Sequence, residues 1–401
     1  MTKQKNLVKV SEGFILIKLK KMTEEQLKIE GKETTPQEAL QPEEGRRRLS
    51  SESVEGLIKE AEKKMSEAKE LIKSAKEQKV QGQGERANLY EEAATRYGEA
   101  AELLKSVGKS QEAAEAILHK AYALEEAEKT ETNPGKKAEL WERIADARKE
   151  RAELLKSVGK FQEAAKAIES KVYALGKAAK IATNPEKMAE LRKLIADAHK
   201  ERAELLEEAQ KLQQAAWAMR FSADVLKEVA QAEKDPEKRA ELYEEAATRY
   251  GEAEKLFRRV WKLEEAAWAI RFRADALKEA EKTVTNPKKK TELWKLIADA
   301  HRKRAEILES DGKLKLEKAA NARLEEAYAL KEAANATKDL EGKSELLRAA
   351  ERAYDEVAKL YESAGKPDKV ALVRVYKEEA LKEVRKIQEE LSSRTPTEDK
   401  T

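Results

Sequence analysis

Cysteine is absent from this sequence, and proline, glycine and long apolar runs are scarce. Without cysteine the chain has no disulfide, no thiolate zinc site and no cysteine nucleophile. No apolar run approaches the roughly 18 residues that a membrane span needs. The run from Phe14 to Ile17 is followed by lysines and is too short for a secretory signal. We therefore expect a protein without membrane spans that resides in the cytoplasm.

A charge excess of either sign is also lacking, although charged residues form 40% of the chain. Lys and Arg number 82 and Asp and Glu number 79, so the formal net charge is only +3. The first 50 residues account for this excess, with 11 Lys and Arg against 8 Glu. Interleaved charges of both signs are typical of solvated, ion-paired helices and argue against a nucleic-acid-binding arm. The abundance of Lys and Glu also favours a thermostable protein.

A repeat of 51 residues runs through most of the sequence. Asn-Pro or Asp-Pro marks the boundaries between copies, and a Gly-Lys pair marks the middle of several copies. A sixth copy follows with a shift of two residues. A fixed period of this length indicates an array of stacked repeats. The leucines that define the period are Leu89, Leu140, Leu191, Leu242 and Leu293.

Each copy contains two amphipathic helices. In the second copy, apolar residues recur at three- and four-residue steps over about 138–158 and again over about 162–181. Gly159 ends the first helix because glycine tolerates a left-handed backbone. Asn184 and Pro185 begin the next helix as its N-cap and first helical residue. Since short links make paired helices antiparallel, we predict an all-α solenoid of about six antiparallel helix pairs.

The first helices carry a pattern that resembles the tetratricopeptide repeat. That family has an aromatic residue, then small residues, then a tyrosine. The matching residues here are Tyr90, Ala93, Ala94 and Tyr97 in the first copy and Tyr243, Ala246, Ala247 and Tyr250 in the fourth. The family's repeat has about 34 residues, so units of 51 would extend both helices by about two turns. The resemblance covers roughly residues 86–391 and implies a right-handed α-solenoid that binds other proteins.

The two ends of the chain differ from the array. Residues 1–50 are polar and largely without periodicity, so we expect a largely disordered N-terminal segment, with short strands as an alternative over 7–19. Residues 51–85 are expected to form a capping helix and a loop. The repeat array then occupies 86–391, and a disordered tail follows over 392–401.

The sequence offers little for catalysis. It contains three histidines, no glycine-rich phosphate loop, no His-Glu-x-x-His motif and no calcium loop. His199 and His301 take the repeat position that Tyr97 and Tyr250 hold in other copies, so we expect them to pack and not to bind metal. We therefore predict a protein that is not an enzyme and has no cofactor.

The second helices of the third and fourth copies depart from the others. Both read Ala-Ala-Trp-Ala-x-Arg-Phe, where the first two copies have Glu115 or Lys166 in place of Trp. Trp261 replaces the glycine of a turn, next to basic residues. Trp and Arg anchor many interfaces, so we predict a partner-binding patch; the alternative is that these aromatics pack one repeat on the next. The candidate residues are Trp217, Arg220, Phe221, Arg258, Arg259, Trp261, Lys262, Trp268, Arg271, Phe272 and Arg273.

Three functions fit these patterns. The leading hypothesis is a protein-binding scaffold or adaptor, because solenoids present extended binding surfaces. A self-assembling structural protein, in which the array ends stack, is the second. Nucleic-acid binding through the basic aromatic patch is the weakest of the three, because the array itself is neutral.

Overall fold

The computed structural model describes residues 51–77, 83–312 and 315–394. These ranges contain thirteen α-helices and no strand. Nearly all of them lie in one compact unit, Glu52–Thr401. The predictions for residues 1–50, for the strands at 7–19 and for the last seven residues of the tail fall outside the described residues. The last helix ends at Arg394, three residues beyond the expected end of the array.

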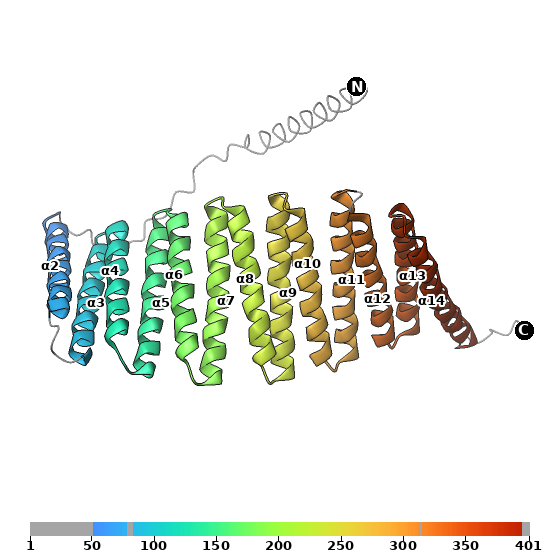
Figure 1. Ribbon diagram of the computed structural model, residues 1–401, viewed down its shortest axis with the longest axis horizontal. Coiled ribbons are helices and arrows are strands. Elements are labelled where there is room, and N and C mark those ends of the chain that lie inside the picture. Colours follow the sequence, from blue (N-terminus) through green and yellow to red (C-terminus); the bar gives the residue numbers. More distant parts are fainter. Residues whose placement is uncertain (1–50, 78–82, 313–314, 395–401) are drawn as a thin grey trace, which may run out of the picture. The chain divides into compact units, whose positions relative to one another are not determined.

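The helices follow one another along the array, and each packs on its neighbours in sequence (Figure 1). A single helix, α2 (Ser51–Glu77), comes first, and six antiparallel pairs follow it. The first three pairs are α3 (Gln83–Ser106) with α4 (Ser110–Thr130), α5 (Pro134–Ser157) with α6 (Phe161–Ile181), and α7 (Pro185–Glu208) with α8 (Leu212–Ala232). The next three are α9 (Pro236–Arg259) with α10 (Leu263–Thr283), α11 (Pro287–Ser310) with α12 (Leu316–Ala336), and α13 (Leu340–Ser363) with α14 (Pro367–Arg394). We call these pairs units 1 to 6.

Recurring polar and glycine residues set the helix ends. The side chains of Asn133, Asn184, Asp235, Asn286 and Asp339 accept hydrogen bonds from backbone N–H groups of the first turn that follows each. Such caps satisfy N–H groups that have no partner within the helix. At their C-terminal ends, most first helices are followed by a glycine with positive φ. These glycines are Gly108, Gly159, Gly312 and Gly365.

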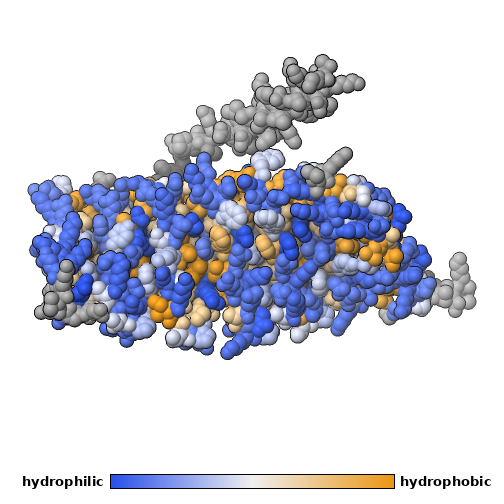
Figure 2. All heavy atoms as spheres, viewed as in Figure 1, coloured by the Kyte–Doolittle hydropathy of each residue, from blue (hydrophilic) through white to orange (hydrophobic). Residues whose placement is uncertain are grey.

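Small residues hold the helices close together. Alanines such as Ala93, Ala114 and Ala216 are at most 1% exposed, and large side chains such as Tyr90 and Phe257 fill the space between helices. No pair buries both of its faces alone, so stability comes from stacking on the next pair. Hydrophilic side chains cover most of the face shown in Figure 2, with smaller hydrophobic areas between them. The predicted α-solenoid of antiparallel helix pairs is confirmed.

Both ends of the array carry polar outer faces. In α12, the alanines that pack on unit 6 are completely buried: Ala320, Ala327 and Ala334. The equivalent positions of α14 hold Ala371, Glu378 and Arg385, and all three are exposed. At the other end, α2 buries Ala61, Ala68 and Ala75 in the core, pairs with α3 through Lys64 and Glu99, and exposes mainly Lys and Glu on its other side. Neither end therefore presents the alanine face that joins two units inside the array.

Candidate protein-binding surface

Unit 3 uses its Trp and Arg to pack against unit 4. The guanidinium of Arg220 lies 5.0 Å from the ring centroid of Trp217 and 5.3 Å from that of Phe272. Trp217 also contacts the ring of Phe257 edge-on, with 5.3 Å between centroids. Cation–π contacts of this kind contribute about 1 kcal/mol or more when partly desolvated. Trp217, Arg220 and Phe272 are half-buried, and they join α8 to α9 and α10.

A partly buried hydrogen bond lies next to this stack. The Tyr250 hydroxyl donates to the Asp224 carboxylate at 2.5 Å, and the Arg220 Nε lies 3.5 Å from the same carboxylate. The rings of Tyr250 and Phe272 are 5.6 Å apart. Burial raises the pKa of Tyr250, and the carboxylate of Asp224 raises it further, so the phenol stays protonated. Trp217, Arg220 and Phe272 thus belong to the contact between repeats.

Unit 4 has the same motif but no such stack. The position that Phe272 holds in unit 4 is occupied by Glu325 in unit 5, and that carboxylate accepts from Lys278 Nζ at 3.0 Å. Trp268 is 53% exposed. Arg271 is exposed and has neither an ion pair nor a ring contact with any described residue. The Trp–Arg pair of unit 4 therefore faces solvent, whereas the equivalent pair of unit 3 is packed.

A second arginine lies beside Arg271. Between units 2 and 3, Arg202 of α7 donates to Glu169 of α6 at 2.8 Å. The same two repeat positions hold Arg304 of α11 and Arg271 of α10 between units 4 and 5. Burial lowers the pKa of Arg304, and the positive charge of Arg271 lowers it further. The Nε of Arg304 is buried and has no hydrogen-bond partner among the described residues. The two repeat positions that form a salt bridge between units 2 and 3 thus hold two positive charges between units 4 and 5.

Phe221 and Arg273 lie on the same two second helices. Phe221 is 45% exposed and contacts the rings of Trp217 and His199 at 6.2 and 5.9 Å. Arg273 is half-buried and lies over Gly251 of α9. Phe221 thus adds to the exposed aromatic surface, while Arg273 is partly covered by its own unit.

The turn between α9 and α10 carries the remaining predicted residues. Trp261 is 84% exposed and has a φ of 58°, a conformation that favours glycine. Arg258 pairs with Glu254 at 3.3 Å, and Arg259 pairs with Glu207 of unit 3. Lys262 pairs with Glu265 at 3.9 Å. The cations of this turn are therefore neutralised, unlike Arg271 and Arg304.

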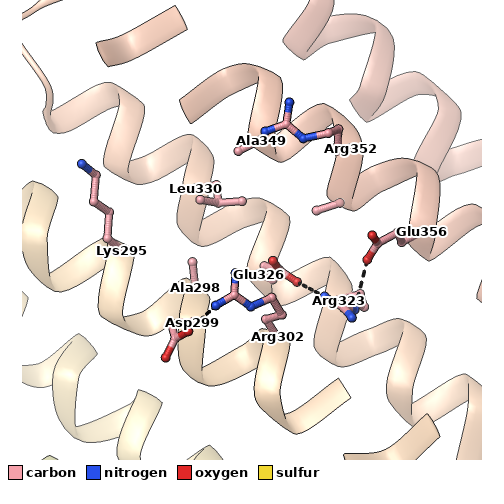
Figure 3. A pocket seen from close by; sticks show the side chains of 11 residues that line it. Lys295, Ala298, Asp299, Arg302, Arg323, Glu326, Leu330, Ala349, Arg352 and Glu356 are labelled. Carbon is pink, nitrogen blue, oxygen red and sulfur yellow. Dashed lines mark hydrogen bonds and ion pairs between the residues drawn. The ribbon is translucent and has the colours of Figure 1, made fainter. Parts of the chain in front are cut away.

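A charged pocket of about 350 Å³ lies between α11, α12 and α13 (Figure 3). Arg323 donates to Glu326 at 3.0 Å and pairs with Glu356 at 3.3 Å, and Asp299 pairs with Arg302. Burial raises the pKa of Glu326. Units 1 to 4 hold an apolar residue at the repeat position of Arg323. A comparison of the copies in sequence therefore reveals Arg323 as an exception. The central charges of this pocket neutralise one another.

The described residues contain no cluster of three His, Asp or Glu side chains that could hold a metal ion. Within the same ranges, no helix has the length and apolar character required to cross a bilayer. His301 is 3% exposed, and its environment lowers its pKa to about 4. His199 is half-buried, and burial lowers its pKa to about 4 as well. Both histidines are neutral packing residues at neutral pH.

No protein-family model matches the sequence, and no curated protein is similar to it. Among solved structures, a circular tandem repeat protein with a novel repeat topology is 15% identical, with a TM-score of 0.40 over 85% of this chain and 86% of that one. A de novo designed helical repeat protein is 24% identical, with a TM-score of 0.32 over 53% of this chain and 99% of that one. The S. pombe nuclear import adaptor Nro1 is 12% identical, with a TM-score of 0.28 over 81% of this chain and 98% of that one. These likenesses concern the fold alone. The helix pairs themselves make the chain a tetratricopeptide-repeat-like α-solenoid with unusually long repeats.

Proposed function

We propose that this chain is a non-catalytic scaffold that binds a protein partner on the second helices of units 3 and 4. The observation that carries the proposal is the exposure of Trp268 and Arg271 in unit 4. Trp268 and Phe221 leave about half of their surface in water, although large aromatics bring roughly 150–250 Å² of buryable area each. Equivalent positions in units 1 and 2 are Glu115 and Lys166, so the fold itself does not need Trp there. Aromatic anchors of this kind are typical of interface centres.

Self-assembly through the ends of the array is the second candidate. The exposed Glu378 and Arg385 weigh against it, because a further helix pair packing there would bury both charges. Leu372 and Val375, which are 50% and 54% exposed, are the features of α14 that favour it. Sedimentation velocity over a hundredfold concentration range separates the two functions, since a scaffold of this type stays at one size.

Nucleic-acid binding has less support. The 71 Lys and Arg after residue 50 are balanced by 71 Asp and Glu, and the cations beside Trp261 are already paired with carboxylates. Binding to a phosphate backbone needs several uncompensated cations. A cytoplasmic location, the absence of enzymatic activity and thermostability remain predictions from the sequence.

The test of the scaffold function compares the protein with its Trp268→Lys variant, which copies the Lys166 of unit 2. Both are immobilised and exposed to a native proteome, and captured proteins are quantified by mass spectrometry. We expect the variant to capture at least one protein about tenfold less than the parent does. Lys166→Ala is the matched control, because it changes the same repeat position outside units 3 and 4. If both variants capture the same proteins as the parent, the surface is wrongly placed.

A further inference from the structure

The arginines beside Trp268 indicate what kind of protein segment this surface takes. We propose that the partner segment is acidic, with a carboxylate between Arg271 and Arg304 and a neighbouring apolar side chain on Trp268. This inference rests on the proposed scaffold function and adds the chemistry of the partner to it.

The first step is the comparison with the interface between units 2 and 3. There, Glu169 and Arg202 place opposite charges at these two repeat positions, 2.8 Å apart. Between units 4 and 5, Arg271 and Arg304 place like charges at them. The positive charge of Arg271 acts on Arg304, and half-burial of Arg304 weakens the solvent screening of this repulsion. The array thus holds positive charge here that stacking of the units does not require.

The second step concerns the hydrogen-bonding capacity of the two arginines. Neither Arg271 nor Arg304 forms an ion pair with a described carboxylate, and the buried Nε of Arg304 lacks a partner among the same residues. A guanidinium presents a planar set of donors that matches a carboxylate in two parallel hydrogen bonds. One carboxylate between the two groups would therefore neutralise the repulsion and supply the missing acceptor.

The third step is the surrounding charge and apolar surface. Asp275 and Glu325 both raise the pKa of Arg304 electrostatically, so negative charge is already present near this arginine. A phosphate backbone with a charge on every nucleotide would be repelled by these carboxylates more strongly than the single charge of one Asp or Glu side chain. Trp268, 53% exposed and three residues before Arg271 on α10, offers an apolar face next to the charge. An acidic residue flanked by an apolar one is the segment that complements this surface.

Arg271→Glu is the decisive variant. It restores the charge pattern of Glu169 and Arg202, so we expect it to form a salt bridge with Arg304 and to leave the melting temperature unchanged or higher. Its effect on binding is opposite, because the glutamate takes the place of the partner's carboxylate. Lys193→Glu on α7 is the control, because Lys193 is exposed, has no ion pair with a described residue and gives the same change in net charge.

The probe is a display library of random 12-residue peptides, selected on the full chain and on each variant. The parent should enrich peptides in which Asp or Glu lies next to Leu, Phe or Trp. Arg271→Glu and Trp268→Lys should each reduce the binding of these peptides about tenfold, and Lys193→Glu less than about twofold. If peptides depend on Trp268 but are neutral or insensitive to Arg271→Glu, the scaffold function holds and the acidic partner is wrong. If no selected peptide depends on Trp268, both proposals fail.

Two other occupants are tested in the same assay. A single-stranded oligonucleotide that binds the parent and is lost with Arg271→Glu would replace the acidic peptide by nucleic acid. The chain's own residues 1–50, which hold 8 Glu, are tested by changing Glu24, Glu25 and Glu30 to Gln within the full chain. If acidic peptides bind this variant but not the parent, the chain's own segment occupies the surface. That result would contradict the proposal that a separate protein binds there.

Discussion

The guanidinium of Arg220 in unit 3 lies 5.3 Å from the ring centroid of Phe272 in unit 4. The contact joins α8 and α10, the second helices of these two units, through two half-buried side chains. Arg271 is the equivalent of Arg220 one unit later, but Glu325 stands where a ring would be needed. The same sequence motif is therefore packed in unit 3 and exposed in unit 4, because the next unit places a different residue beside it. In unit 3 it packs one repeat on the next, and in unit 4 its Trp and Arg are exposed to solvent.

The two tryptophans of this motif should differ in their effect on stability. Trp217→Lys removes the contacts with Phe257 and Arg220, and we expect a loss of about 2 kcal/mol in the free energy of unfolding. Trp268→Lys replaces an exposed side chain and should change stability by less than about 0.5 kcal/mol. Urea denaturation monitored by circular dichroism measures both, with midpoints compared directly because repeat arrays need not unfold in two states. Equal losses would show that Trp268 also packs between repeats.

The two lowered histidine pKa values predict a loss of stability in acid. His199 and His301 have pKa values of about 4 in the folded chain, against about 6.5 when unfolded. Because the unfolded state binds protons more readily, the contribution of each histidine is complete above pH 6.5 and is lost as the pH falls towards 4. Each is worth up to about 3 kcal/mol over that window.

The matched variant for this effect is His199→Tyr with His301→Tyr, which uses the residue of Tyr97 and Tyr250 at the same repeat position. The carboxylates also titrate in part of this range, so the informative quantity is the difference between parent and variant. Melting temperatures from pH 7 to pH 4.5 should fall more steeply for the parent. Parallel curves would mean that the histidines are accessible to protons in the folded chain.

The array should tolerate the loss of one internal unit. Deleting residues 135–185 removes one repeat and joins α4 to α7 with the same spacing as α4 to α5. Since each unit contacts only its neighbours, we expect a shorter folded array with an unchanged helical fraction. Circular dichroism and size-exclusion chromatography provide the test. Aggregation of the shortened chain would show that the 51-residue repeat is not an independent structural unit.

Repeat comparison predicted the architecture well because caps and turns are local. Asn184 and Pro185 begin α7, and Gly159 adopts the left-handed backbone expected of it. The start of α5 is four residues earlier than predicted, at Pro134, because the Asn133 cap begins the helix before its first apolar residue. Local rules of this kind act within a few residues and can be read from one copy.

Exposure of the candidate residues could not be read in the same way. Trp217 and Trp268 have the same neighbours in sequence, yet their surroundings depend on Phe272 and Glu325 one unit later. The sequence prediction did not include Arg304, because it lies on a first helix and the prediction compared second helices. Its like charge with Arg271 is recognised only when the two positions are compared with the Glu169–Arg202 pair. A comparison of facing positions between neighbouring units would have revealed the like-charge pair from sequence alone. The direction of each side chain, by contrast, requires the packed structure.

Trp261 combines a strained backbone with an exposed ring. Its φ of 58° is close to the 75° of Gly159 at the equivalent turn, and its side chain is 84% exposed. A left-handed conformation costs a residue with a Cβ roughly 1 kcal/mol, so Trp261→Gly should stabilise the array by about that amount. Gln210→Gly is the matched control, because Gln210 has a φ of 57° at the same repeat position.

The pair of variants also decides whether Trp261 belongs to the binding surface. Both should raise the urea midpoint, since the ring at position 261 has little packing to lose. If Trp261 anchors a partner, Trp261→Gly weakens binding of the captured protein about tenfold while Gln210→Gly leaves it unchanged. A strained, exposed tryptophan would then be retained for binding at the expense of stability. Equal binding by both variants would confine the surface to Trp268, Phe221 and the two arginines.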